Sequence, residues 1–463
     1  MREIVALWRS QNPWLGTVLL IAASARLSAW FLVAGVEPVG DEVSYLMAAY
    51  RLANSRTIDD FWPPVTGVLT STAFLIGGSE VAARFLWVVM GTVNVYLLYV
   101  LLSRYLDAPV PALASAVYSV YIPAISFSVF VTSETPAALF FLIAAILVLD
   151  PHKKVPMWRC LLAGLAGALL ILSRPSLAFL SLVVALFAAP VPISGTGKHG
   201  RTTACLAVLF SCSLVVAPWI VRNYAVHGSF LVAGNTGYNF YLGNNPEYQE
   251  DLNLFNPVPT RAQVAHRRTL LLGQQGSPLK IPPDLKEQMS QAFQYIREEP
   301  VLFARRALGR LARILVPKTS PLVMLGGEKN SPVFHAKAAV LLLATNGLYG
   351  AMLFLGWAGI ILCGNSPGET HFRKLALSVI AASSVLCMVA ISKPRYSFPF
   401  DPFLAAGLCW LVWNRHRLKM YLDKKSLWVI AAGWLFFAWT WIAWLVFAFL
   451  SRAAVYTNAL PTG

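Results

Sequence analysis

Long apolar runs dominate this sequence and restrict the folds open to it. A helix needs about 20 apolar residues to cross a bilayer, and runs of this length or somewhat shorter recur along the 463 residues. The predicted spans are 14–34, 81–102, 109–129, 136–149, 161–172, 177–189, 203–221, 338–363, 375–391, 398–412 and 427–450. Charged residues are only 13% of the chain, about half of what a soluble surface needs. We therefore expect an all-α polytopic membrane protein with about eleven spans, within a range of about 10–13.

Basic residues in the short loops predict the orientation of these spans. With the N-terminus in the cytoplasm, the inner loops carry fifteen Lys and Arg against five Asp and Glu, and the short outer loops carry six against seven. Short loops rich in Lys and Arg stay on the cytoplasmic side. Part of the net charge of +16 thus marks topology, and we expect no nucleic-acid partner. The predicted location is a bacterial inner membrane, with membrane lipids as partners.

One segment, residues 223–337, is too long and too polar to be a connector. It predicts an extracytoplasmic loop with interfacial helices, and it divides the chain into a module at 1–222, the loop at 223–337 and a second module at 338–463. The first outer loop, at 35–80, is also predicted to hold interfacial helices, near 40–50 and 65–76.

Polar residues that are unusual at a membrane boundary all fall on the predicted outer face. They are Asp41-Glu42, Glu134, Arg174, Arg222-Asn223 and Arg395-Tyr396. Charged residues at a membrane boundary with no anchoring purpose indicate a functional site. We therefore expect a cavity mouth lined by carboxylates and arginines.

Simpler roles stay open for several of these residues. Asp41 fits a helix N-cap, Glu42 fits a first-turn acid that complements the helix dipole, and Arg174 fits a snorkelling side chain. The segment 301–316 alternates leucines with arginines, as in a basic amphipathic helix on a membrane surface. Its arginines either anchor to anionic headgroups or bind a lipid phosphate.

No metal site is predicted from the cysteines. All six lie in or at the ends of predicted spans, without CxxC or His-rich spacing, and we interpret them as small buried apolar residues. A divalent cation at the adjacent carboxylates of Asp41 and Glu42 stays open as a cofactor, and no other cofactor is expected.

The order of the motifs resembles the GT-C membrane glycosyltransferases, and within them the protein O-mannosyltransferase and lipid A aminoarabinose transferase group. The motifs that carry the resemblance are Asp41-Glu42, Trp62-Pro63-Pro64, Ser133-Glu134, Ser173-Arg174-Pro175, Pro218 to Tyr224, Gly237-Tyr238-Asn239, Leu242 to Pro246, Glu299-Pro300 and Arg395 to Pro399. They span nearly the whole chain, and their order and shared side are more specific than any one of them.

The resemblance implies a GT-C fold and a sugar donor linked to polyprenyl phosphate, used on the outer face. It places Asp41 as the general base that deprotonates the acceptor hydroxyl, with Glu42 beside it as a second catalytic residue. Arg174, Arg222 and Arg395 are the expected ligands of the donor phosphate. Other residues expected at the cavity are Tyr45, Glu134, Tyr238, Asn244, Asn245, Lys393 and Tyr396.

Two positions depart from the aminoarabinose branch, which has an arginine where this chain has Ser44 and a lysine where it has Trp62. This argues against that specific activity. The predicted function is an inverting glycosyltransferase from a lipid-linked sugar to a hydroxyl, with a glycolipid or cell-envelope glycan favoured as acceptor. The alternatives are a transporter or flippase, or a non-catalytic scaffold, for a lipid-linked saccharide.

Overall fold

The computed structural model describes residues 13–58, 61–76, 78–149, 155–188, 200–228, 230–246, 254–255, 285–325, 331–420 and 422–457. Most of the central part of the predicted long loop, 247–284, therefore lies outside the described residues. Every helix and short helical turn of the described chain follows in order.

The first half contains α2 (Pro13–Val33), α3 (Asp41–Ser55), α4 (Pro64–Leu75), α5 (Glu80–Leu102), α6 (Val110–Val120), α7 (Ile122–Val129), α8 (Glu134–Val148), α9 (Met157–Ser173), η1 (Pro175–Leu177), α10 (Ala178–Ala188) and α11 (Gly200–His227). The second half contains α12 (Gly234–Gly243), α14 (Leu285–Glu298), α15 (Pro300–Leu315), η2 (Ser320–Met324), α16 (Pro332–Ala351), η3 (Met352–Gly356), α17 (Trp357–Leu362), α18 (Pro367–Val389), η4 (Pro394–Ser397), α19 (Asp401–Trp413), η5 (Arg415–Met420) and α20 (Lys424–Thr457).

Each predicted span coincides with a helix or a pair of helices, but their lengths differ. Within the described ranges, six helices are long and apolar enough to cross a membrane, or seven if α6 and α7 form one span bent by 61°. Four further predicted spans, α8, α9, α10 and α19, are shorter apolar helices. The all-helical polytopic architecture is therefore confirmed, while eleven crossings stay a prediction.

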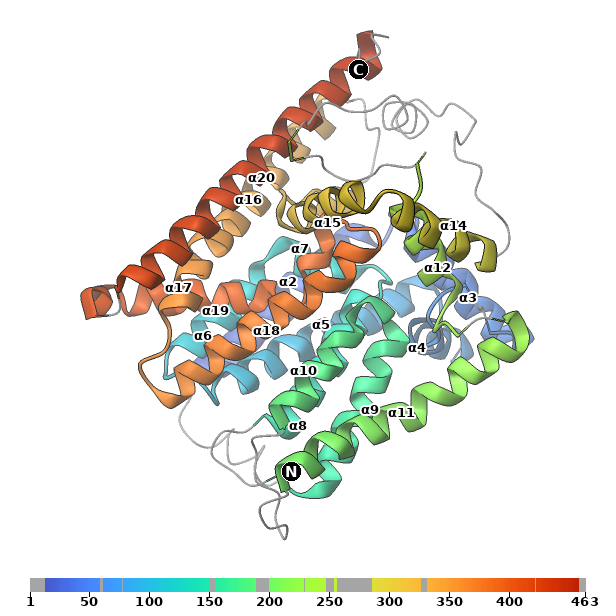
Figure 1. The fold of residues 1–463 in the computed structure, drawn as a ribbon, viewed down its shortest axis with the longest axis horizontal. Helices are drawn as coiled ribbons and strands as arrows, with labels where there is room; N and C mark the ends of the chain where they lie inside the picture. Colours follow the sequence, from blue (N-terminus) through green and yellow to red (C-terminus); the bar gives the residue numbers. More distant parts are fainter. Residues whose placement is uncertain are drawn as a thin grey trace.

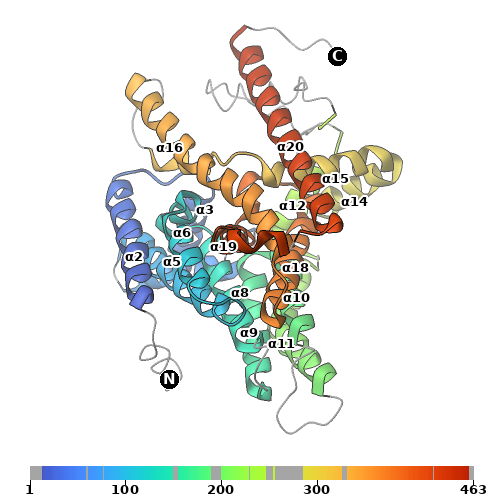
Figure 2. The same ribbon diagram turned by 90° about the vertical axis from the view of Figure 1, so that its left-hand side faces the viewer.

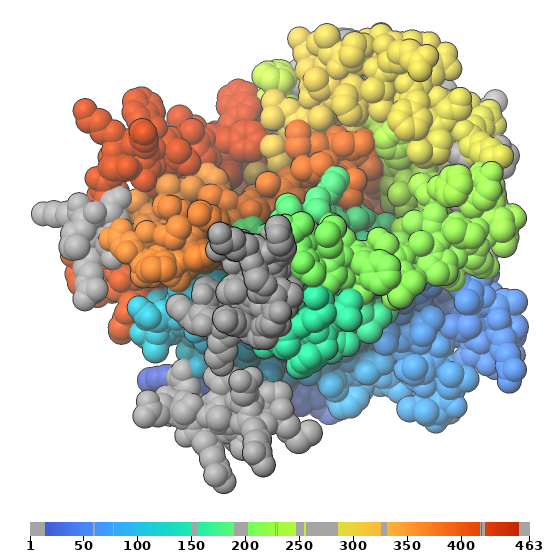
Figure 3. All heavy atoms as spheres, turned by 60° about the horizontal axis from the view of Figure 1, so that its bottom comes forward, coloured from blue at the N-terminus to red at the C-terminus, as the bar shows by residue number. Residues whose placement is uncertain are grey.

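The helices form one bundle in which neighbours along the chain pack together (Figure 1). Helix α9 packs against α8, α10 and α11, and α19 packs against α6 and α17. In the space-filling view, the green segment that contains α11 lies between the blue N-terminal helices and the orange and red C-terminal ones (Figure 3). Helices α17 and α19 approach closely at Gly359 and Gly407, where a Cβ on either residue would meet the other helix. Small residues allow such an approach in membrane bundles.

The break between α6 and α7 explains the buried position of Arg26. Pro123 has no N–H to donate to the Ser119 carbonyl four residues earlier. Arg26 Nη1 donates to this carbonyl instead, at 3.3 Å, and its Nε donates to Ser128 Oγ at 3.3 Å. Arg26 is thus a structural residue that completes a broken helix.

The interfacial helices expected from the sequence lie at one end of the bundle. Helices α3, α4 and α12 gather there, at the right in Figure 1. Turned by 90°, α14 and α15 lie beside α12 and α20 (Figure 2), and α14 packs on α12 while α15 packs on α18 and α20. The starts of α3 and α8 and the ends of α9 and α18 also reach this end, which is where the polar residues meet.

Candidate functional site

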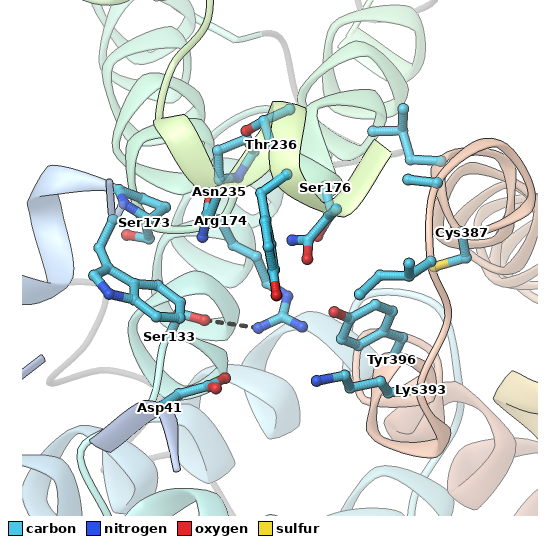
Figure 4. A pocket seen from close by; sticks show the side chains of 18 of the residues that line it. Asp41, Ser133, Ser173, Arg174, Ser176, Asn235, Thr236, Cys387, Lys393 and Tyr396 are labelled. Atoms are coloured by element: carbon cyan, nitrogen blue, oxygen red, sulfur yellow. Dashed lines mark hydrogen bonds between the residues drawn. The ribbon is translucent and has the colours of Figure 1, made fainter. Parts of the chain in front are cut away.

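A cavity of about 380 Å³ opens between the ends of these helices. Its wall is formed by the start of α3, the segment before α4, the turn after α9, helix α12 and the stretch from the end of α18 through η4. The volume lies in the range of small-molecule sites. Figure 4 shows the labelled lining residues, with Asp41 and Lys393 on one side of the cavity and Asn235 and Thr236 on the other.

Asp41 is the first residue of α3 and faces this cavity. It follows Gly40, whose φ of 61° few residues other than glycine adopt, and its side chain caps no backbone N–H of the helix. Arg395 donates from Nη2 to Asp41 Oδ2 instead. Burial alone would raise the pKa of Asp41, but the charges of Arg395, Lys393 and Arg174 outweigh it and hold the pKa below its ordinary value. Asp41 is therefore a carboxylate under working conditions.

Arg395 lies between two carboxylates. Besides Asp41, it faces Glu134, with 3.4 Å between Nε and Oε1. Burial alone would lower the pKa of Arg395, but Glu134 and Asp41 raise it. Glu134 begins α8, is buried, and binds Arg174 Nη1 at 2.9 Å. The cluster is thus an alternating chain of charges, Asp41–Arg395–Glu134–Arg174, and we call it the open cluster.

Arg174 is held in place and does not snorkel. It follows α9 in extended backbone, its Nη1 donates to Ser133 Oγ at 2.6 Å (Figure 4), and its guanidinium lies 4.7 Å from the ring of Tyr396. Such a contact with a ring adds attraction in a desolvated site. The predicted residues Arg174, Tyr396 and Glu134 are therefore brought together.

Lys393, Tyr45 and Tyr238 also line the cavity, as predicted. The Lys393 ammonium donates no hydrogen bond to the other residues that the structure describes, although its charge acts on Asp41. Tyr45 packs against Trp62, with ring centroids 5.0 Å apart. Burial is the main cause that raises the pKa of Tyr45, with smaller contributions from Asp41 and Glu134. The Tyr45 side chain is therefore a neutral phenol.

Glu42 does not reach the cavity, contrary to the expected catalytic position. It is 3% exposed, and both of its oxygens bind the guanidinium of Arg84, at 2.9 Å each. Oε1 also accepts the Val131 N–H at 2.9 Å. Arg84 in turn donates to the carbonyls of Val33 and Val36. We call this group the sealed pair.

The sealed pair also decides whether Asp41 and Glu42 can bind a divalent cation together. Because Arg84 occupies both Glu42 oxygens, Asp41 and Glu42 present no shared set of oxygen ligands. Within the described ranges, no three His, Cys, Asp or Glu side chains converge on one point. The residues present do not fit a metal at this position.

Three further predicted residues lie away from the cavity lining. Arg222 bonds Asn223 Oδ1 at 2.9 Å and stacks on Trp219. Asn244 donates to the carbonyls of Phe240 and Val389, and Asn245 donates to that of Tyr241. The two asparagines thus join the end of α12 to its surroundings, and nothing places these three residues on the donor.

Two arginines of α15 bind carbonyl groups of the protein. Arg310 is fully buried and donates to the carbonyls of Gly243 and Met388, and Arg306 donates to that of Asn245 at 2.9 Å. Arg305 is exposed. Arg310 and Arg306 thus bind carbonyls of the protein, and a grip of other arginines of α15 on a lipid phosphate stays a prediction.

Lys318 is a residue that the sequence did not single out. Only 1% exposed, its Nζ donates to the carbonyl of Pro394 at 2.6 Å and to that of Ile314 at 2.7 Å. Burial lowers the pKa of Lys318 to about 7, and Asp401 opposes this in part. The side chain ties the end of α15 to the turn η4 that carries Arg395. A lone lysine after an amphipathic helix gives no sequence signal of this role.

Part of this chain matches a known protein family. The sequence profile of a family described as dolichyl-phosphate-mannose-protein mannosyltransferase matches residues 62–221. Over this segment, which is less than half of the chain, the protein is similar to that family of mannosyltransferases. The matched segment contains Glu134 and Arg174 of the open cluster, while Asp41 and Arg395 lie outside it. No curated protein matches the sequence.

Solved structures of the oligosaccharyltransferase of Archaeoglobus fulgidus are similar to this chain. The complex with Zn and sulfate has 15% identity and a TM-score of 0.48 over 94% of this chain and 53% of that chain. The form tethered to an acceptor peptide has 14% identity and a TM-score of 0.43, over 98% and 56%. The complex with an inhibitory peptide and a dolichol-phosphate has 15% identity and a TM-score of 0.37, over 97% and 56%. This chain spans about half the length of those chains.

Proposed function

We propose that this protein is a glycosyltransferase that moves a sugar from a polyprenyl-phosphate-linked donor to an acceptor hydroxyl, with inversion at the anomeric carbon. The observation that carries the proposal is the meeting of Asp41 with three cations, Arg174, Lys393 and Arg395, at one cavity. The matched family is described by a dolichyl-phosphate-linked mannose donor, which supports a lipid phosphate as the carrier.

The charges of the cavity favour an anionic ligand. Asp41 and Glu134 neutralise two of the three cations through the contacts of the open cluster. Lys393 is left as the surplus cation, with its ammonium free of hydrogen bonds to described residues. A phosphate completes this balance, since a compact ammonium binds phosphate as a point charge. Lys393 and Arg395 are therefore the proposed ligands of the donor phosphate, with Arg174 behind them.

The reaction requires one proton transfer and one displacement. The acceptor oxygen forms a bond to the anomeric carbon while the bond from this carbon to the phosphate oxygen breaks. Asp41 takes the acceptor proton as general base, and the electron pair of the broken bond leaves with polyprenyl phosphate. Lys393 and Arg395 stabilise the charge on the departing phosphate. A single attack of this kind inverts the anomeric configuration.

The Asp41–Arg395 contact suggests how donor binding prepares the base. A carboxylate bonded to an arginine is a weak base. A donor phosphate competes for the same guanidinium, which Glu134 still holds through Nε. When Arg395 moves to the phosphate, Asp41 loses its partner and becomes more basic. Deprotonation of the acceptor thus follows donor binding.

The proposed setting is the outer face of a bacterial inner membrane. The site combines the predicted first outer loop, 35–80, with residues after the seventh and ninth predicted spans, which the positive-inside rule places on one side. We keep the division into modules at 1–222 and 338–463 around a loop at 223–337. A glycolipid or cell-envelope glycan is the favoured acceptor class.

The test uses the purified protein in proteoliposomes with radiolabelled polyprenyl-phosphate sugars. We expect label on an acceptor with the opposite anomeric configuration, together with released polyprenyl phosphate. Movement of the intact labelled lipid between leaflets, without any transfer of the sugar, would instead identify a flippase.

A further inference from the structure

One side of the cavity carries rings and amides instead of charges. Its members, which we call the aromatic–amide face, are Phe61, Trp62, Asn235, Tyr238 and Asn239. The ring centroids of Phe61 and Trp62 lie 5.4 Å apart, and those of Phe61 and Tyr238 lie 5.9 Å apart. The Asn235 N–H donates to the Phe61 carbonyl at 2.9 Å. Helix α12 and the segment before α4 thus form one continuous surface.

The amides of this face are available to a ligand. Asn235, Tyr238 and Asn239 are spaced i, i+3 and i+4 on α12, which places them on one side of the helix. The side chains of Asn235 and Asn239 form no hydrogen bond with other residues in the described part of the chain. Asn244 and Asn245, a few residues further on, donate to backbone carbonyls instead. The contrast separates amides that hold the fold from amides that face the cavity.

The chemistry of the face fits a neutral ligand with hydroxyl groups. None of its five side chains is charged at neutral pH, and its Asn235 lies across the cavity from Lys393 and Asp41 (Figure 4). A side-chain amide offers two donors and an acceptor, which match neighbouring hydroxyls, and aromatic rings cover apolar C–H surface. A saccharide ring presents both features, whereas a phosphate prefers the cationic side.

We propose that the aromatic–amide face is a saccharide subsite, with the ring covered by Trp62 or Tyr238 and its hydroxyls bonded to Asn235 and Asn239. The proposal rests on the proposed function, because the open cluster must bind the phosphate for this face to meet a sugar. The ring belongs either to the donor sugar or to a glycan acceptor, and the two sources make different kinetic predictions.

The experiment compares wild type with Asn239→Ala, Asn235→Ala and Lys393→Met in nanodiscs. Asn54→Ala is the matched control, because Asn54 is an exposed asparagine at the end of α3. The probes are polyprenyl phosphate, polyprenyl-phosphate mannose and polyprenyl-phosphate glucose for binding. Methyl glycosides and a serine- and threonine-containing peptide serve as acceptors for transfer.

Asn239→Ala and Asn235→Ala are expected to bind polyprenyl phosphate as wild type does. We expect a loss of about fivefold or more in affinity for the sugar-bearing donors, or an equal rise in KM for methyl glycosides. The first result assigns the ring to the donor and the second to the acceptor. Unchanged values in both variants would overturn the subsite, as would a selective rise in KM for the peptide alone.

Lys393→Met separates this proposal from the proposed function. If Lys393→Met binds polyprenyl phosphate as tightly as wild type, the phosphate site and the proposed function fail. If its binding falls while the two asparagine variants behave as wild type, only the saccharide subsite fails. Elution of each variant as a single species on gel filtration confirms that the fold is retained.

Discussion

The sealed pair and the open cluster each contain a carboxylate of α3, Glu42 and Asp41, bound to an arginine. The two carboxylates are adjacent in sequence but differ in exposure and in how many partners they share. Glu42 and Arg84 satisfy each other with two parallel hydrogen bonds and are closed off from the cavity. Asp41 is 32% exposed at its side chain and shares Arg395 with Glu134. The sealed pair has no capacity left for a ligand, whereas the open cluster carries a surplus positive charge.

The comparison teaches which arginine–carboxylate contacts are structural. Arg84 also donates to the carbonyls of Val33 and Val36 at the end of α2, so the sealed pair fixes α2, α3 and α5 together. Breaking a buried pair leaves an uncompensated charge. An open cluster tolerates exchange of partners, and this exchange is what a reaction with a charged donor requires.

Breaking the sealed pair should have the largest effect on the free energy of unfolding. We expect Arg84→Met to lower the free energy of unfolding by about 3–5 kcal/mol, since Glu42 is left charged and buried. Thermal unfolding in detergent measures the change. Arg395→Met is the comparison, and a loss of stability as large as that of Arg84→Met would erase the distinction between the two groups.

Removing the shared arginine should impair catalysis more than stability. Arg395→Gln is expected to reduce transfer by about 100-fold, because one donor to the leaving phosphate is lost. The variant also removes the main charge that lowers the pKa of Asp41, so this pKa rises. As the pH falls, activity should therefore begin to decline at a higher pH than in wild type. A pH–rate profile with an unchanged acid limb would argue against Asp41 as the titrating base.

Lys393→Met should affect donor binding more than turnover. A hydrogen bond to a charged group contributes about 1.5–3 kcal/mol, so we expect KM for the donor to rise by about 10–100-fold. As the pH falls, activity of this variant should also begin to decline at a higher pH than in wild type, as in Arg395→Gln. Initial rates over a donor titration give both values, and an unchanged KM would remove Lys393 from the phosphate site.

The smallest effect is expected at an arginine that belongs to neither group. Arg305 is exposed on α15, so Arg305→Gln should change the free energy of unfolding by less than about 0.5 kcal/mol and leave transfer unchanged. The same two assays provide the baseline for the variants above. A large loss of transfer would show that α15 contacts the substrate directly.

The sequence was sufficient for most of the helices and for the side on which the polar residues meet. Apolar length predicts the helices at the expected spans but not α12 or α14, and loop charge places Asp41, Glu134, Arg174 and Arg395 on one side before any contact is known. It was not sufficient to separate Asp41 from Glu42, because the partner of Glu42 lies 42 residues away in α5. Adjacent residues of a helix point in different directions, and only the packing decides which of them faces a cavity.

The motifs that carry the family resemblance did not predict what each of their residues does in the structure. Asn244 and Asn245 belong to a motif that carries the resemblance, yet their amides hold the end of α12. Asn235 gave no signal in the sequence and Asn239 only as part of the Gly237-Tyr238-Asn239 motif, although both line the cavity. Which asparagines bind backbone carbonyls and which line the cavity depends on residues that are distant in sequence.

The most direct test measures sugar transfer per folded molecule for Asp41→Asn and Glu42→Gln, with Asp107→Asn as the exposed control. We expect Asp41→Asn to keep wild-type thermal stability and to lose transfer by about 10²–10⁴-fold, the usual contribution of a general base. Glu42→Gln should be less stable, while the fraction that folds transfers sugar at nearly the wild-type rate. If Asp41→Asn retains transfer and folded Glu42→Gln loses it, the base is the wrong carboxylate and the account of the open cluster is contradicted.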